Sequence, residues 1–467
     1  MIPGMRRIAL LAVLCLPFYG LASQAPDNPE SKIDAVFSRW TRETPGCAVG
    51  VGRGGSPVLQ KAYGMADLEH GVANVPDTIF EAGSVSKQFT AAAVLLLAQE
   101  GKLSLDDQAR KYLPEVPEYA TPLTVRQMLQ HTSGLRDWGE IAAIAGWPRT
   151  SRAHTHAHVL DIVGRQKALN FPSGTQWSYS NTGYNLAAVL VSRVSGKSFA
   201  EFSQERIFGP LGMTRTSWRD DYTRIVKGRA IAYSSSADGY RTNMPFENVH
   251  GNGGLLTTVG DLLKWNENFV TPKVGDAAFV KIQQEPGRLN DGKLHDYALG
   301  LTVRPYKGVP EVSHSGATAG YRAHLTRFPQ QHLSVAVLCN VSTGTATQYA
   351  QTVAELYLGD AIKAMTAPPA QRPARSATTF TPDAKDLAAY AGRYYSEEAE
   401  VVYEITLDGA AIVMKRRPDM TFPLRPVARD EFSGPGGTIR FLRAPSGEVN
   451  EFSFRGSRVF DLRFQRR

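Results

Sequence analysis

The sequence predicts a mixed α/β (α+β) domain that is followed by a small all-β unit. Three observations lead to this fold class. Strand-like and helix-like hydrophobic periods alternate between about residues 30 and 360. A helix-like run over 84–100 is apolar on nearly every side, which is typical of a helix buried in the centre of a sizeable domain. After residue 384, short alternating runs are separated by glycine turns, as in an antiparallel barrel or sandwich.

The first segment, residues 1–22, has the pattern of a secretory signal peptide. Arg6 and Arg7 precede an apolar stretch over 8–19, and small residues follow at 20–22. This stretch is shorter than the roughly 20 apolar residues that cross a bilayer. We therefore expect a periplasmic or secreted protein without a transmembrane span in its mature chain. An uncleaved membrane anchor is the alternative.

The large segment over 30–362 is predicted to form one domain. Its hydrophobic periods change from strand-like to helix-like and back, so both kinds of element belong to it. The elements expected in it are a strand at 47–52, a helix at 84–100, a hairpin of strands at 321–328 and 333–339, and a helix at 345–358.

Residues 363–383 are rich in Ala, Pro, Thr and Ser, which predicts a linker. In the last segment, 384–467, Tyr403, Ile405 and Leu407 recur on one face, and Asp408-Gly409 gives a turn signal directly afterwards. We expect this segment to be a separate barrel-like domain.

Composition excludes several classes of protein. Of 467 residues, 42 are Gly and 28 are Pro, too few for a collagen-like chain, and 21% charged residues argue against bulk disorder. The net charge is +8, but the basic residues are scattered along the chain. Because nucleic-acid binding needs basic residues gathered on one face, no nucleic-acid partner is expected.

Two cysteines remain after the predicted cleavage, Cys47 and Cys339, and both lie in strand-like apolar runs. We expect two separate buried thiols, which behave as small hydrophobic side chains. A disulfide is the alternative, since an exported pair can oxidise.

The buried helix begins with Ser84 and Lys87, which are three residues apart and therefore share one face of its first turn. A lysine at the start of an apolar helix is costly unless it has a partner or a chemical task. Burial and the positive helix terminus both lower a lysine pKa and make a neutral amine available. Such an amine can take the proton of the serine hydroxyl and activate it as a nucleophile.

Two further triplets follow at long separations. Tyr179-Ser-Asn181 precedes an apolar helix-like run, and His314-Ser-Gly316 precedes a predicted strand. The order Ser-x-x-Lys, Tyr-x-Asn, His-x-Gly resembles the serine β-lactamase and penicillin-binding protein superfamily, in the branch of class C β-lactamases, DD-carboxypeptidases, D-aminopeptidases and related esterases. Further segments resemble that family in family order: 80–89, 101–107, 131–135, 210–213 and 253–258.

The resemblance covers about residues 30–360 and implies a mostly antiparallel sheet flanked by helices, with an all-helical region over roughly 90–230. It also implies roles for the first two motifs. Ser84 would be the acylated nucleophile and Lys87 its base. Tyr179 would exchange protons with Ser84 or with the leaving group, and Asn181 would bind the substrate amide.

By the same resemblance, residues 314–317 would bind substrate. These are His314, Ser315, Gly316 and Ala317, with the backbone N–H groups of Ala317 and Ser84 forming an oxyanion hole. His314 takes the place that lysine holds in class C enzymes, and Ser315 replaces the commoner threonine. Because imidazole titrates near pH 6.5, a site that grips a substrate carboxylate through His314 would weaken above that pH.

The resemblance therefore favours a D-amino-acid peptidase or an esterase over a true β-lactamase, and implies no metal or organic cofactor. The substrate would be a small molecule, a peptide or a cell-wall fragment; the oligomeric state is left open. The lipocalin-like appendage of some relatives resembles the C-terminal segment. A non-catalytic envelope module is the non-enzymatic alternative.

A histidine-rich run offers a rival signal. His154, His156 and His158, with Asp161 nearby, would suggest a metal site if they faced one another. On a helix only the first and third histidines share a face, and the run leads into a helix-like segment. We therefore expect no metal here.

Overall fold

The computed structural model describes Met1 and residues 29–362, 380–409 and 411–467. The predicted signal peptide at 1–22, apart from Met1, and most of the predicted linker at 363–383 lie outside these residues. The domain boundaries at 362 and 384 stay predictions. Within the described ranges, no helix has the length and apolar composition needed to cross a membrane.

A six-stranded antiparallel sheet organises the first part of the described chain, with the order β12-β13-β14-β15-β1-β2. This order places the two N-terminal strands beside β15, far along the sequence. The strands are β1 (Cys47–Arg53), β2 (Ser56–Tyr63), β12 (Thr302–Tyr306), β13 (Val309–Thr318), β14 (Tyr321–Phe328) and β15 (Leu333–Cys339). The expected first strand and the expected hairpin are thereby confirmed.

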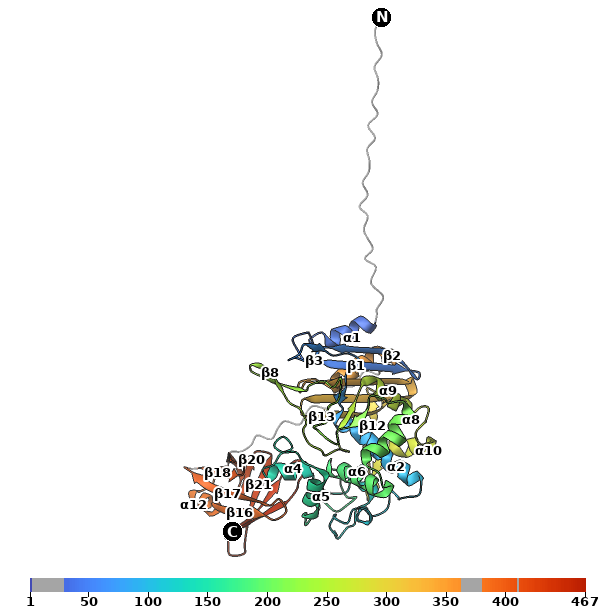
Figure 1. Cartoon of the computed structure of the whole chain (residues 1–467). Coiled ribbons are helices and arrows are strands. Elements are labelled where there is room, and N and C mark those ends of the chain that lie inside the picture. Colours follow the sequence, from blue (N-terminus) through green and yellow to red (C-terminus); the bar gives the residue numbers. More distant parts are fainter. Residues whose placement is uncertain (2–28, 363–379, 410) are drawn as a thin grey trace.

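Helices cover both faces of this sheet, and the alternation of side chains along β1 shows why (Figure 1). Val49 and Val51 pack with α1 (Pro29–Phe37) and α11 (Ala346–Leu358) in one hydrophobic cluster. Ala48 belongs to the cluster on the other face, which includes α2 (Lys87–Gln99). Successive residues of a strand point to opposite faces, so one short apolar run serves two layers.

The two cysteines of the described chain form a disulfide, so the expectation of two separate thiols was wrong. Cys47 and Cys339 stand directly opposite each other in the β1–β15 register, with their Cα atoms 4.0 Å apart. The bond joins residues 292 positions apart in sequence. Strand pairing over this distance brings the thiols together, and each strand-like run taken alone carries no sign of its partner.

The region expected to be all-helical contains helices and one short strand, β6. Trp138, at the start of α4, is fully buried there and donates through its indole N–H to Asn185 Oδ1 at 2.8 Å. The elements of this region are α3 (Val125–Leu129), α4 (Trp138–Ile144), α5 (His156–Gly164), α6 (Thr182–Ser195), α7 (Phe199–Ser203), η3 (Gln204–Phe208), α8 (Gly209–Leu211) and β6 (Ser217–Trp218).

Small elements complete the first part of the chain and connect the helices to the sheet. They are β3 (Met65–Asp67), β4 (Val72–Ala73), β5 (Phe80–Glu81), η1 (Gly83–Ser86), η2 (Ala109–Lys111), β7 (Tyr233–Ser236), β8 (Gly239–Thr242), β9 (Leu255–Thr257), α9 (Val259–Glu267), α10 (Ala277–Gln284), β10 (Gly287–Arg288), β11 (Leu294–His295), η4 (Pro329–Gln331) and η5 (Gly359–Ala361).

The C-terminal part is a closed antiparallel barrel of eight strands in the described residues, which confirms the expected all-β unit. Tyr403 and Ile405 point into its core as predicted, whereas Leu407 at the strand end is exposed. Aromatic rings fill the interior, among them Phe452 stacked on Phe464 at 4.4 Å. Its elements are α12 (Ala384–Tyr390), β16 (Gly392–Ser396), β17 (Val401–Asp408), β18 (Ala411–Arg416), β19 (Met420–Ala428), β20 (Glu431–Gly434), β21 (Gly437–Arg443), β22 (Val449–Arg455) and β23 (Leu462–Arg466).

The barrel packs against the helical region, next to α4 and α5 (Figure 1). Arg136 and Glu398 form an ion pair across this interface at 2.5 Å, and both side chains are buried. The hydroxyl of Tyr403, inside the barrel, donates to the carbonyl of Ile144 at 2.9 Å. Buried polar contacts of this kind favour one orientation of the docked barrel, because another docked orientation would bury these charged groups without partners.

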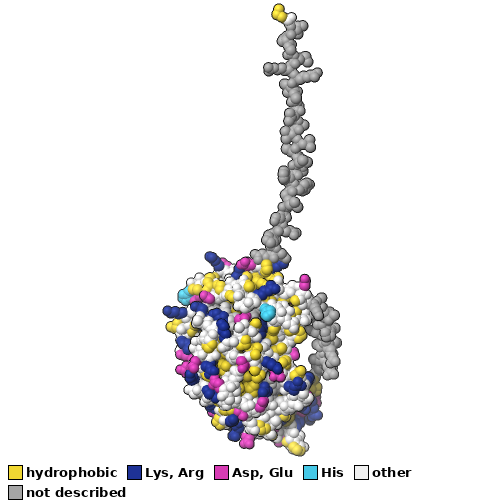
Figure 2. Space-filling model, turned by 90° about the vertical axis from the view of Figure 1, so that its right-hand side faces the viewer, with side chains coloured by type: hydrophobic (Ala, Val, Ile, Leu, Met, Phe, Trp, Pro, Cys, Tyr) yellow, Lys and Arg dark blue, Asp and Glu magenta, His cyan; other side chains and the backbone are white. Residues whose placement is uncertain are grey.

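On the face drawn in Figure 2, the Lys and Arg side chains of the described residues are interspersed with Asp and Glu. On this one face (Figure 2), the described residues show no continuous basic stripe of the kind that follows a nucleic-acid backbone.

Candidate functional site

The candidate nucleophile lies at the junction between a 3₁₀ turn and the buried helix. Ser84 belongs to η1, and Lys87 is the first residue of α2, so the helix begins three residues later than expected. In a 3₁₀ turn, side chains three residues apart eclipse one another. The Lys87 Nζ accordingly lies 3.2 Å from the Ser84 Oγ.

Lys87 is completely buried and held by three oxygen atoms. Besides Ser84, its amine donates to Asn181 Oδ1 at 2.9 Å and to the carbonyl of Asn252 at 2.7 Å. Burial, and after it the positive charge of Arg458, hold the pKa of Lys87 well below its usual value. A lowered pKa makes the neutral form of this amine more available, as a general base for Ser84 requires.

Tyr179 and Asn181 lie directly before α6 and bring a second segment to the same point. Burial raises the pKa of the Tyr179 hydroxyl, and a hydrogen bond with Ser84 acts in the opposite direction. Asn181 uses its amide oxygen for Lys87 and donates through its amide nitrogen to Asp137 Oδ2 at 3.0 Å. The Asn181 side chain therefore orients the base. Its predicted contact with a substrate amide stays a prediction.

The end of β13 forms the opposite wall. Gly83 has a φ of +51°, and a Cβ at this position would lie 2.6 Å from the Ala317 backbone nitrogen. Only glycine permits this approach, which brings the backbone of η1 against residues 316 and 317. Ser315 and Ala317 are exposed to the cleft, while Gly316 is buried. The backbone nitrogens that the resemblance assigns to an oxyanion hole thus lie in adjacent segments.

His314 does not behave as the sequence predicts. Burial, and then the charge of Lys87, lower its pKa to about 3, so it does not titrate near pH 6.5. Its Nδ1 lies 2.6 Å from the carbonyl of Ser315, which can only accept, so Nδ1 carries the proton. The Nε2 then accepts from the Tyr297 hydroxyl at 2.9 Å. His314 is a neutral group with both nitrogens engaged, and it supplies no cation for a substrate carboxylate.

These segments surround a cleft with a volume of about 760 Å³. Every predicted site residue except Lys87 lines it, and Lys87 lies beneath Ser84. A second cavity of about 580 Å³ lies at the other end of the sheet, near residues 263–273, and none of the predicted site residues lines it.

Sequence reasoning missed four residues of this site. Asp137 holds Asn181, the Asn252 carbonyl binds Lys87, Tyr297 binds His314, and Arg458 enters from the barrel. Asp137 and Asn252 lie within two residues of the family-like segments 131–135 and 253–258. Polar residues next to such segments are therefore a signal that could have identified both. Tyr297 and Arg458 stand in segments without any motif.

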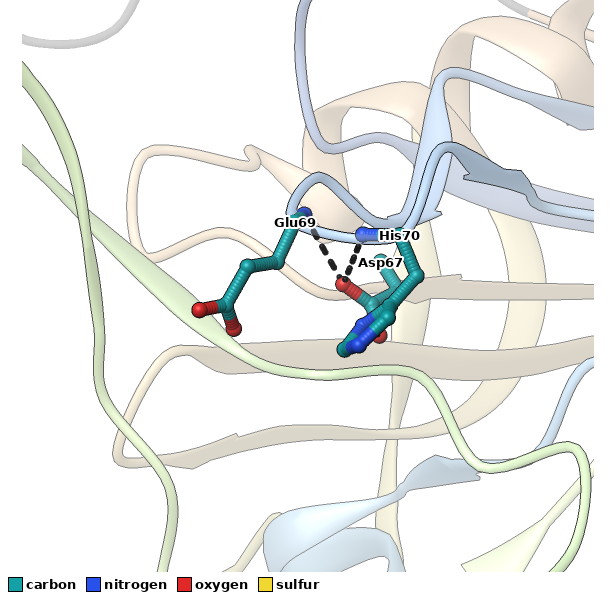
Figure 3. Close-up of side chains that lie close together, drawn as sticks. All are labelled: Asp67, Glu69 and His70. Atoms are coloured by element: carbon teal, nitrogen blue, oxygen red, sulfur yellow. Dashed lines mark hydrogen bonds and ion pairs between the residues drawn. The ribbon is translucent and has the colours of Figure 1, made fainter.

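The histidine-rich run does not bring three potential ligand atoms together in the described structure. His156 Nε2 pairs with the carbonyl of His250 at 3.0 Å, while the His158 ring caps the start of α5 by accepting from Thr155 N. Among the described residues, one exposed group has three potential ligand atoms close together: Asp67, Glu69 and His70. Figure 3 shows that Asp67 there accepts the backbone N–H groups of the other two residues, as an ordinary turn does.

Comparisons with known proteins agree with this geometry. The Beta-lactamase family model matches residues 33–358. Penicillin-binding protein 4* of Bacillus subtilis (strain 168) is 27% identical over 421 residues, covering 85% of this chain and 87% of the relative. A D-aminopeptidase of Gluconobacter oxydans (strain 621H) is 29% identical over 329 residues and matches 70% of this chain. The chain spans 61% of the length of that relative.

One solved structure extends the likeness through the barrel. The octameric penicillin-binding protein homologue from Pyrococcus abyssi has a TM-score of 0.62 at 24% identity, covering 93% of this chain and 98% of that chain. At this identity the likeness concerns the fold. The D-aminopeptidase relatives are hydrolases by name. With a family match over more than two thirds of its length, the chain belongs to the Beta-lactamase family of hydrolases.

Proposed function

We propose that this protein is an exported serine hydrolase that cleaves amide or ester bonds next to D-amino acids through an acyl-enzyme on Ser84. The observation that carries the proposal is the buried Lys87 amine, 3.2 Å from the Ser84 Oγ and with a lowered pKa. The names of the D-aminopeptidase relatives support the D-configured substrate. Export is supported by the predicted signal peptide and by the disulfide, since disulfides persist in oxidising compartments.

The steps follow from the contacts. Lys87 takes the Ser84 proton while the Oγ attacks the substrate carbonyl, and the backbone N–H groups of Ser84 and Ala317 stabilise the resulting oxyanion. The proton then passes through the Tyr179 hydroxyl to the leaving amine or alcohol, and the C–N or C–O bond breaks. Water attacks the acyl-enzyme, gives one proton back to Ser84 through the same groups, and releases the acid.

The test is a hydrolysis panel on the purified mature protein, with D- and L-alanyl anilides, a chromogenic ester and a chromogenic cephalosporin. The Ser84→Ala and Lys87→Ala variants should each lose turnover while remaining cooperatively folded, and Lys87→Ala should melt at a lower temperature because two buried oxygens lose their donor. Lys102→Ala, an exposed lysine after the same helix, is the matched control and should keep full activity.

Intact-mass spectrometry gives a second readout, because an acylating substrate should add its acyl mass to the wild type and not to Ser84→Ala. Turnover that survives in Ser84→Ala would contradict the mechanism. Preference for the cephalosporin would identify a β-lactamase instead. A folded protein that shows neither turnover nor an adduct would favour the non-catalytic envelope module.

A further inference from the structure

The cleft around Ser84 carries an unbalanced charge. Three arginines line it, and among the described residues no aspartate or glutamate does. These arginines come from three different parts of the chain: Arg149 from the helical region, Arg322 from β14 and Arg458 from the barrel. Because His314 is neutral, any attraction for an anion must come from the arginines.

The charge of Arg149 is neutralised by an ion pair with Glu247. Its guanidinium pairs with both carboxylate oxygens of Glu247, with one contact at 2.8 Å, and the Glu247 side chain is buried. A paired guanidinium adds little net field, since its charge is cancelled at close range.

Arg322 has no such partner in the described part of the chain. Its guanidinium donates to the carbonyls of Ala319 at 2.9 Å and Tyr321 at 2.7 Å, and no carboxylate lies within ion-pair distance. In the strand register Arg322 stands opposite Ala317, and its guanidinium bonds to carbonyls at the turn between β13 and β14, at the edge of the cleft.

Arg458 lies over the ring of Tyr179, with its guanidinium carbon 4.9 Å from the ring centroid. Its guanidinium is 3.7 Å from Asp137 Oδ2, but that carboxylate already accepts three N–H groups, two from Asn181 and one from Glu140. The Arg458 side chain is 41% exposed, and no described group accepts a hydrogen bond from its guanidinium. Its N–H donors are therefore open to solvent and available to an external acceptor.

The backbone around Arg458 is firmly held. Glu140, on α4, accepts the backbone N–H groups of Ser457 at 2.9 Å and Arg458 at 2.7 Å. Asn170 donates to the Arg458 carbonyl at 2.8 Å. A Cβ on Gly456 would fall 1.9 Å from Glu140 Oε1, so the glycine leaves room for this carboxylate in its present position. The loop between β22 and β23 is thus built to deliver one arginine to the cleft.

We propose that Arg458 is a specificity-determining residue that binds a carboxylate on the leaving group of the substrate, with Arg322 adding to the positive field. This inference rests on the proposed function, in which Tyr179 delivers the proton to the leaving group. Because Arg458 lies over Tyr179, the preferred leaving group is an amino acid with a free α-carboxylate. The protein then acts as a carboxypeptidase on D-configured peptides, rather than at a free amino terminus.

A binding experiment tests this independently of turnover. The full-length mature chain carrying Ser84→Ala is titrated calorimetrically with N-acetyl-D-alanyl-D-alanine and with the C-terminal amide of the same dipeptide. The acid should bind about 10-fold to 100-fold more tightly, the range of a hydrogen-bonded charge pair. Adding Arg458→Gln should remove this preference, and Arg458→Lys should retain part of it.

Arg455→Gln is the matched control, because it removes an equal charge from an exposed residue three positions away and should leave the preference intact. Melting temperatures report whether the barrel stays docked in each variant. Equal binding of acid and amide, binding of neither, or a preference that survives Arg458→Gln would overturn the proposal. A clear acid preference without any turnover in the wild type would instead contradict the hydrolase and leave the carboxylate site standing.

Discussion

Removing the disulfide should destabilise the first domain by an amount set mainly by the length of chain that it closes. The perturbation is the double variant Cys47→Ala/Cys339→Ala, or reduction of the wild type. With the cysteines 292 positions apart in sequence, the chain-entropy relation gives about 5–6 kcal/mol, and native disulfides typically contribute about 2–5 kcal/mol. We expect the lower range, because residual structure in a long unfolded chain reduces the entropy that the cross-link removes.

Thermal unfolding followed by tryptophan fluorescence is the appropriate assay. All six tryptophans lie between Trp40 and Trp265, five of them inside the cross-linked loop and none in the C-terminal barrel, so the signal reports the first part of the chain. For a domain of roughly 330 residues the unfolding entropy is about 0.7 kcal/mol per degree, so a loss of about 2–5 kcal/mol lowers the Tm by about 3–7 °C.

The reductant should shift the wild type and leave the double variant unchanged. Two free thiols per chain in the denatured, unreduced mature protein would refute the cross-link outright. A variant that melts together with the oxidised wild type would refute the entropic argument.

Three further predictions concern buried ionisable side chains. Lys87→Ala should lower kcat/KM about 10²–10⁴-fold, which is the usual contribution of a general base. The activity of the wild type should fall with decreasing pH as the Lys87 amine becomes protonated. Stopped-flow hydrolysis measured over a series of pH values checks both predictions. In the folded chain His314 has a pKa of about 3 and stays neutral, whereas an unfolded histidine takes up a proton below about pH 6.5. Acidification from about pH 6.5 toward about pH 3 should therefore lower the free energy of unfolding. His314→Gln should make this free energy, measured by urea titration, less dependent on pH. Arg136→Met should cost about 3–5 kcal/mol because Glu398 stays buried without its partner, and adding Glu398→Gln should recover part of the loss in calorimetry; a double variant no more stable than the single one would argue against coupling.

Local patterns predicted those parts of the site that are close together in sequence. Ser84 and Lys87 share a turn, and the apolar run that follows them is buried on all sides, so both the helix and the serine–lysine pair could be inferred from one segment. The eight-stranded barrel could likewise be anticipated, because alternating runs with glycine turns pair with their sequence neighbours.

Features that depend on distant segments could not be inferred. The pairing of Cys47 with Cys339 requires that β1 lie beside β15, and no local pattern gives strand order. The lowered pKa of His314 arises from burial and from the charge of Lys87, which belongs to another element. Arg458 reaches the cleft only through docking of the barrel, which is fixed by polar contacts scattered over both parts.

The distance in sequence between paired strands, which is large for β1 and β15, also influences how quickly each part of the chain can fold. Each barrel strand pairs with the next one along the sequence until β23 closes on β16, so its contacts form early and locally. In the reduced chain the central sheet instead waits for a partner 292 residues away, and such non-local pairing slows folding because loop closure precedes any gain from contact. We therefore expect two refolding phases, with a fast barrel and a slow sheet, and a cleft that is completed last.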